Sequence, residues 1–187
     1  MRRVLLGVCL LIVSHVVEAR EPERSTHVRA ELVEMRRLIA DAAERSVTIR
    51  ALIDALDDSD VIVYVRPRPF QSVAFEGRTV LLGVRGRRRF LVVELACPRI
   101  QKRQMATLAH ELQHVVEIAR AGWVVDAATL ARYYGENGIR VDTAEGVATF
   151  ETEAARRVGV RADAEIWAYE ATREPSGARP TQTGDRP

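Results

Sequence analysis

The segment LAHELQHVVEIA, residues 108–119, places two histidines one helical turn apart inside an apolar run. His110 and His114 leave the same face of a helix because they are four residues apart. The neighbouring residues are apolar on the other faces, so we expect this helix to lie in the protein interior. Burying two imidazoles and the Glu111 carboxylate costs free energy unless they have partners. The chain must therefore fold around a polar cluster, held either by a metal ion or by hydrogen bonds between the histidines.

Two histidines on one turn of a helix have the spacing of a tetrahedral zinc site. Glu111 projects beside them, where it could take a proton from a water molecule and deliver it to a leaving amine. A hydrolytic zinc site also needs a third protein ligand and an open fourth position. His27 is far upstream on a predicted surface helix, so we expect a carboxylate in that role. The downstream candidates are Asp126, Glu136, Asp142, Glu145, Glu151 and Glu153.

Helical periodicity favours Glu151 among these carboxylates. On a predicted helix over 143–158, Glu151 shares a face with small apolar residues and has no cation beside it. Glu153 points elsewhere and can pair with Arg157, so it is predicted to lie at the surface. A carboxylate that faces inward without a cation indicates a metal. Glu117 lies one turn beyond His114, and the rise of the helix gives it at most a supporting or structural role.

HELQH, followed by FETEAA with Glu151 37 residues after His114, resembles the gluzincin group of zinc metallopeptidases. The resemblance covers residues 78–160 and implies a zincin-like fold with one Zn²⁺ held by His110, His114 and Glu151. It also implies that Glu111 is the catalytic base. The family has an aspartate that braces a ligand histidine, and here Ala155 stands in its place.

The resemblance implies two further parts of a peptidase site. Such peptidases have a side chain that donates to the oxyanion, and the candidates between the two motifs are Tyr133, Tyr134 and Arg140. They also have a strand at the cleft that pairs with extended substrate, a part that RFLVVELA (residues 89–96) could play. Alternatively, the two tyrosines only pack against neighbouring side chains, and the strand is an ordinary strand of the core.

The hydrophobic pattern predicts an α+β fold with N-terminal helices and a small, mainly antiparallel sheet, followed by the HExxH helix and a second ligand-bearing helix. The arginines of RGRRR (residues 85–89) are predicted to lie at a solvated hairpin tip, and GENG (135–138) to form a turn. We expect helices over 27–45, 48–56, 100–121, 126–134, 143–158 and 161–173, and strands over 61–65, 78–84 and 89–96.

The first 19 residues have the pattern of a secretory signal peptide. A basic start precedes an apolar run from Val4 to Val17, and small residues lead to a cleavage position after Ala19. This run is shorter than the roughly 20 residues that span a bilayer, so we expect cleavage and no stable membrane insertion; an uncleaved anchor is the alternative. Residues 20–174 then form one zincin-like domain, and 175–187 have the composition of a disordered tail.

These features together predict a secreted or periplasmic zinc-dependent peptidase that acts on a peptide or protein. The net charge of +2 does not indicate a nucleic-acid partner. After cleavage Cys97 is the one remaining cysteine, so no internal disulfide is expected. Two alternatives remain: a zinc-stabilised binding or structural module without turnover, and a metal-free domain in which the motif is a coincidence. Nothing in the sequence indicates the oligomeric state.

Overall fold

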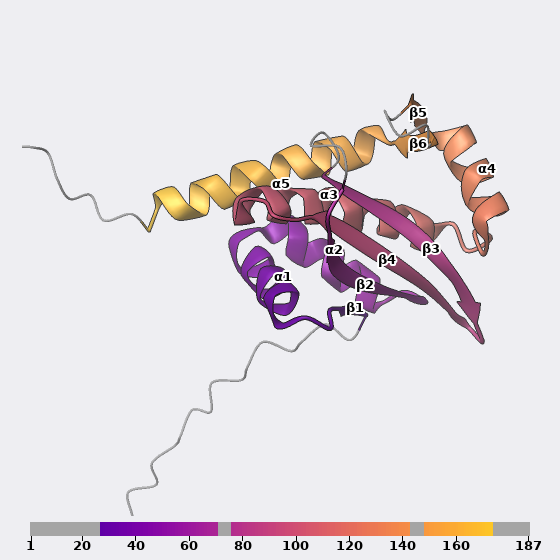
Figure 1. Cartoon of the computed structure of the whole chain (residues 1–187), viewed down its shortest axis with the longest axis horizontal. Coiled ribbons are helices and arrows are strands. Elements are labelled where there is room, and N and C mark those ends of the chain that lie inside the picture. Colours follow the sequence, from indigo (N-terminus) through magenta and orange to yellow (C-terminus); the bar gives the residue numbers. More distant parts are fainter. Residues whose placement is uncertain (1–26, 71–75, 143–147, 174–187) are drawn as a thin grey trace, which may run out of the picture.

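The structure is a computed structural model that describes residues 27–70, 76–142 and 148–173 (Figure 1). The predicted leader (1–19) and tail (175–187) lie outside these residues. The described part of the chain contains five helices and two sheets, which confirms the α+β class. None of the helices in this part is both long and apolar enough to cross a membrane.

The main sheet has four strands in the order β1-β2-β4-β3. β1 pairs with β2 and β2 pairs with β4 in parallel, whereas β3 and β4 are antiparallel. The sheet is therefore mixed, and the prediction of a mainly antiparallel sheet is wrong. The strand bounds are Val28–Arg29 (β1), Val61–Arg68 (β2), Gly77–Arg85 (β3) and Arg88–Ala96 (β4).

The β3–β4 hairpin has the strands that the sequence predicts, extended by a residue or two. Its turn contains Gly86 at φ 61°, a left-handed conformation that glycine adopts without steric cost. The pairing register shifts between Leu81 and Gly83, where Gly83 has φ 141°. Because β4 is flanked by β2 and β3, both of its edges are already paired. RFLVVELA is therefore a core strand, and the free edge of the sheet on this side belongs to β3.

One face of the sheet packs against the helices. Alternate residues along β2 and β4 point into the core, as the two-residue period of a strand requires. The opposite face of these strands carries the buried side chains of Ile62 and Val92 as well as Glu94, which pairs there with Arg66 and Arg78. The core-facing residues of the two strands are Val61, Val63, Val65, Leu91, Val93 and Leu95.

The helix that carries the histidines lies at the centre of the molecule. This helix, α3 (Gln101–Arg120), packs on the sheet, on α1 (Val33–Arg45) and α2 (Val47–Asp57), and on α5 (Glu153–Ala171). Figure 1 shows α5 running alongside α3. The prediction of an interior helix is confirmed, since side chains on all sides of α3 are buried.

Three helix predictions need correction. The first helix begins at Val33, because Val28 and Arg29 form strand β1 of the sheet. The two helices expected over 143–158 and 161–173 are the single helix α5. The helix expected over 126–134 continues to Asn137, so most of GENG is helical.

A small unit follows α3 at the end of the molecule where α5 begins (Figure 1). It consists of α4 (Ala127–Asn137) and an antiparallel pair of strands, β5 (Ile139–Asp142) and β6 (Ala148–Glu151). Asp126 and Thr129 form a capping box that fixes the start of α4. The two strands were not predicted, and they place Glu151 at the end of a strand.

Arg89 is buried, contrary to the prediction of a solvated arginine cluster at the hairpin tip. Its side chain is 2% exposed, whereas Arg85, Arg87 and Arg88 are exposed. The guanidinium forms two hydrogen bonds with the Asp60 carboxylate. It also donates to carbonyl oxygens at and beyond the C-terminus of α3, where the last turn of a helix leaves carbonyl groups without intrahelical donors. These carbonyls belong to Ile118, Ala119, Ala121 and Val124.

Candidate metal centre

His110, His114 and Glu151 come together although 37 residues separate Glu151 from His114. Each offers one ligand atom, and the three atoms lie within 4.8 Å of one another. Glu151 Oε1 is 3.2 Å from His110 Nε2 and 4.0 Å from His114 Nε2. The two rings are edge to face, with centroids 4.9 Å apart. Both imidazoles therefore direct the same nitrogen toward the carboxylate.

Glu151 reaches the cluster from a strand, so the prediction that it lies on a helix is wrong. It is the last residue of β6, and Thr152 after it is the N-cap of α5. The Thr152 hydroxyl accepts a hydrogen bond from the Ala155 backbone N–H, which fixes where the helix starts. The position of Glu151 is thus set by a strand end and a helix cap together.

Close packing between α3 and α5 supports the cluster. Gly159 on α5 faces His110, and a Cβ at that position would lie 3.3 Å from the His110 Cβ and 3.6 Å from its Nδ1. A larger side chain there would push the imidazole. Glycine at 159 therefore lets α5 approach α3 at the first histidine.

Two of the three separations between ligand atoms are close to those of a tetrahedral ion, and the third, between the two imidazole nitrogens, is at most 4.8 Å. Zinc bonds of about 2.1 Å at tetrahedral angles would place neighbouring ligand atoms about 3.4 Å apart. The distances from Glu151 Oε1 to the two imidazole nitrogens, 3.2 and 4.0 Å, bracket that value. Two imidazole nitrogens and one carboxylate oxygen form a donor set that zinc accepts. The chemistry of the donor set and the position of Glu151 therefore suit the metal that the sequence predicts.

Glu111 is buried beside the cluster, against the edge strand β3. It is 5% exposed, and its Oε2 accepts a hydrogen bond of 2.8 Å from the Thr79 hydroxyl. A Cβ at Gly77 would lie 2.9 Å from Glu111 Oε1 and 2.7 Å from Thr107 Cγ2. Burial raises the pKa of Glu111, and the neighbouring histidines only partly oppose this shift. Its carboxyl is thus held in place by β3.

His110 and Glu151 favour each other's charged forms in the metal-free protein. Burial alone would lower the pKa of His110, but contact with Glu151 and the charges of Glu111 and Glu151 outweigh burial and raise it. Burial alone would raise the pKa of Glu151, but the contact with His110 and the histidine charges lower it. A cation placed between them would compete with a proton for the His110 ring.

Glu117 contacts His114 on the side away from Glu151. Its Oε2 lies 3.3 Å from His114 Nδ1, and its Oε1 accepts a hydrogen bond of 2.8 Å from the Thr152 hydroxyl. Burial would raise the pKa of Glu117, but hydrogen bonds from His114 and Thr152 outweigh it and lower that pKa. This position agrees with the supporting role expected from the sequence.

Tyr134, one of the three predicted oxyanion donors, packs on His114. Its ring lies edge to face with His114, at 5.6 Å between centroids, and stacks on Phe150. Burial, followed by the charges of Glu117 and Glu111, raises the pKa of Tyr134, which keeps its hydroxyl protonated. Tyr133 packs on the other side of Tyr134, and Arg140 is exposed on β5.

The other predicted carboxylates that the structure describes have different roles. Asp126 caps α4, Glu136 pairs with Arg132, and Glu153 is a surface residue that pairs with Arg157 as expected. The side chains of Asp142 and Glu145 lie outside the described residues. His27 is buried rather than on a surface helix, and its Nδ1 is 2.7 Å from the Leu56 carbonyl oxygen.

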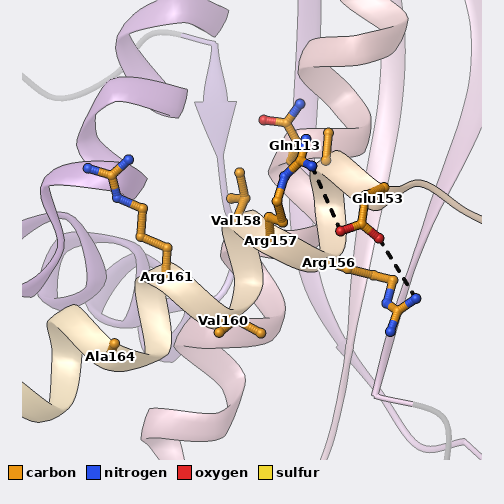
Figure 2. A pocket seen from close by; sticks show the side chains of 9 residues that line it. Gln113, Glu153, Arg156, Arg157, Val158, Val160, Arg161 and Ala164 are labelled. Carbon is orange, nitrogen blue, oxygen red and sulfur yellow. Dashed lines mark ion pairs between the residues drawn. The ribbon is translucent and has the colours of Figure 1, made fainter.

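A hollow of about 670 Å³ lies near the cluster but is separate from it. It runs along α5 and includes Gln113 from α3, and Figure 2 shows Glu153 and Arg156 paired at one end. Neither histidine nor Glu151 lines it. We therefore assign the candidate site from the side chains of the cluster and not from this hollow.

The sequence interpretation missed Gly77, Thr79 and Thr152. Thr79 could have been found, because it alternates with Leu81 on the inward face of its strand and is a polar residue there. Nothing in the sequence pairs Gly77 with Glu111, since 34 residues separate them. Thr152 directly precedes the helix start, as N-caps do, but the helix was placed too early to show it.

The chain matches no protein-family model, no curated protein and no solved structure. What the site can do follows from its own side chains. Two imidazoles and a carboxylate offer three ligand atoms, and the buried carboxyl of Glu111 offers a proton acceptor beside them.

Proposed function

We propose that the protein is a zinc-dependent peptidase of the gluzincin type, exported by its leader to the periplasm or the exterior. The observation that supports this most is the convergence of His110, His114 and Glu151 beside the buried carboxyl of Glu111. Each of these residue types has a role in metal-assisted hydrolysis, and they meet from separate elements of the fold.

In this proposal the three ligand residues hold one Zn²⁺, which would lower the pKa of a water molecule and polarise a peptide carbonyl. Glu111 takes the proton of the attacking water and passes it to the leaving nitrogen. Its raised pKa suits both steps, because a base that titrates nearer neutrality can also return the proton. Thr79 and Gly77 fix the direction of the Glu111 carboxyl.

Tyr134 is our choice for the donor to the oxyanion. Its ring is in contact with His114, and its pKa is raised first by burial and then by the carboxylates around it. A hydroxyl that stays protonated is able to donate a hydrogen bond to negative charge as that charge develops. Tyr133 contacts Tyr134, and Arg140 is exposed on β5.

The substrate is proposed to be an extended peptide or protein segment along the outer edge of β3. That edge belongs to the last strand of the sheet, and the same strand carries the Thr79 and Gly77 contacts with Glu111. Backbone hydrogen bonds to an edge strand align an extended chain without requiring a particular sequence.

A second candidate is a zinc-stabilised module without turnover. The observation that favours it is the enclosure of Glu111, which is 5% exposed and hydrogen-bonded to Thr79. Ala155, in the place of the aspartate of gluzincins, is in line with reduced catalysis. This module would bind zinc as the peptidase does.

Substitution of Glu111 by Gln separates the two candidates. The peptidase should retain its zinc but lose at least about 100-fold in peptide hydrolysis, because the amide cannot act as a base. Glu153→Gln, which changes a surface carboxylate, is the control and should retain both. Hydrolysis that persists in Glu111→Gln would disprove the role of Glu111. Zinc binding without any cleavage of a broad peptide library by the native protein would favour the module.

A further inference from the structure

In gluzincins an aspartate braces one of the ligand histidines. This chain has Ala155 at the corresponding position and therefore lacks that carboxylate. Ala155 is fully buried and has no side-chain group that could hold an imidazole. A histidine binds a metal through one ring nitrogen. If its other nitrogen has no hydrogen-bond partner, the ring can rotate, and its proton can occupy the nitrogen that should bind the metal. Another group in this chain could supply the missing contact.

Glu117 makes the required contact from a different element. It lies on α3, three residues after His114, and its Oε2 is 3.3 Å from His114 Nδ1. It is 8% exposed, so the carboxylate acts in a largely dry environment. His114 Nε2, on the opposite side of the ring, is the nitrogen that faces Glu151. The carboxylate is therefore placed to hold the proton on Nδ1 and leave Nε2 unprotonated.

The second oxygen of Glu117 connects the histidine to the other ligand. Glu117 Oε1 accepts a 2.8 Å hydrogen bond from Thr152, which directly follows Glu151 and caps α5. Gln113 donates to the same oxygen at 3.3 Å. One carboxylate thus links the imidazole on α3 to the strand end that carries Glu151.

We propose that Glu117 is the positioning residue of this site and takes over the function of the carboxylate missing at 155. It sets the tautomer and orientation of His114 and, through Thr152, holds Glu151 at the correct distance from both histidines. The inference rests on the zinc site of the proposed function but not on peptide hydrolysis.

Zinc affinity is the first measurement, made on the full protein by competition with a chromophoric chelator. Glu117→Ala should weaken binding 10- to 100-fold, the usual effect of removing the partner of a ligand histidine. Glu117→Gln keeps an acceptor oxygen without the charge and should fall between Ala and the native residue. Glu153→Ala, a surface carboxylate on α5, is the matched control and should bind as the native protein does.

Thr152 provides a second variant in case Glu117→Ala does not fold. Thr152→Val removes the hydroxyl that donates to Glu117 and should also weaken zinc binding, whereas Thr152→Ser retains the hydroxyl and should restore it. The loss in Thr152→Val with recovery in Thr152→Ser supports the link between the two ligands. Equal affinity in Val, Ser and native proteins would overturn that link.

The tautomer of His114 is the second measurement, made by ¹⁵N NMR of the ring in metal-free protein. The native protein should carry the proton on Nδ1, and Glu117→Ala should shift it toward Nε2. An unchanged tautomer together with unchanged zinc affinity in Glu117→Ala would overturn the proposal. If the native protein binds no zinc, the proposed function fails, and the tautomer result alone then decides the role of Glu117.

Discussion

Gly77 offers a direct test of how the fold places Glu111. A Cβ at this position would lie 2.7 Å from Thr107 Cγ2 and 2.9 Å from Glu111 Oε1. Carbon atoms in good contact are about 3.5 Å or more apart, so Gly77→Ala is short of space by about 0.8 Å. This shortfall is against Thr107, and the Glu111 carboxyl oxygen is also too close, so both side chains and β3 must move apart.

The expected cost follows from that overlap. Overpacking of this kind destabilises proteins by about 1–3 kcal/mol. For a domain of this size each kcal/mol lowers Tm by about 3 °C, so we expect a Tm about 3–9 °C below that of the native protein. A displacement of about 1 Å in a catalytic group costs about 100-fold in rate. Zinc affinity should remain unchanged, because Glu111 is not a ligand.

Thermal unfolding, zinc titration and peptide hydrolysis measured on the same preparations test this prediction. Gly135→Ala is the control, because nothing lies within 4 Å of its added Cβ and it is inside α4. It should raise stability by up to about 1 kcal/mol through helix propensity. If Gly77→Ala melts and hydrolyses as the native protein does, β3 does not position Glu111 and the reasoning is refuted.

Two further predictions concern Arg89 and the pH dependence of metal binding. Arg89→Met removes the buried guanidinium that donates to carbonyl groups at the end of α3, and it should destabilise the protein by about 3 kcal/mol in chemical unfolding. The exposed Arg88→Met should change stability by less than about 0.5 kcal/mol. Equal effects of the two changes would contradict the capping role of Arg89. His110 must lose its proton to bind zinc, so zinc affinity should fall as the pH decreases through the pKa of His110. Because that pKa is raised, the decline should begin above pH 6.5. A decline that begins only below pH 6 in chelator competition would be inconsistent with the contact between His110 and Glu151.

The histidine helix and the residues that gather around it could largely be predicted from sequence. The spacing of His110 and His114 and the surrounding apolar pattern are local, and α3 has nearly the predicted bounds. Glu151 was selected for an inward position on a helix, but it reaches the cluster from the end of β6. The choice rested on helical periodicity, which does not apply at the end of a strand, and on the lack of a neighbouring cation, which does not require the correct secondary structure.

Long-range features of the fold could not be predicted in this way. The hairpin signal around Gly86 favoured antiparallel pairing, but the parallel pairing of β2 with β4 depends on contacts far apart in sequence. Arg89 belongs to a basic cluster typical of a solvated turn, and only the tertiary structure places it at the end of α3. The contact of Gly77 with Glu111 likewise arises only when β3 packs on α3.

The central claim is that two imidazoles and Glu151 together hold one metal ion. Elemental analysis and zinc titration of the reconstituted native protein, beside Glu151→Ala and Glu153→Ala, test it most directly. We predict one zinc per chain in the native protein and in Glu153→Ala, and a loss of at least about 100-fold in affinity in Glu151→Ala. A native protein without zinc, or a Glu151→Ala variant that binds it equally well, would contradict the account.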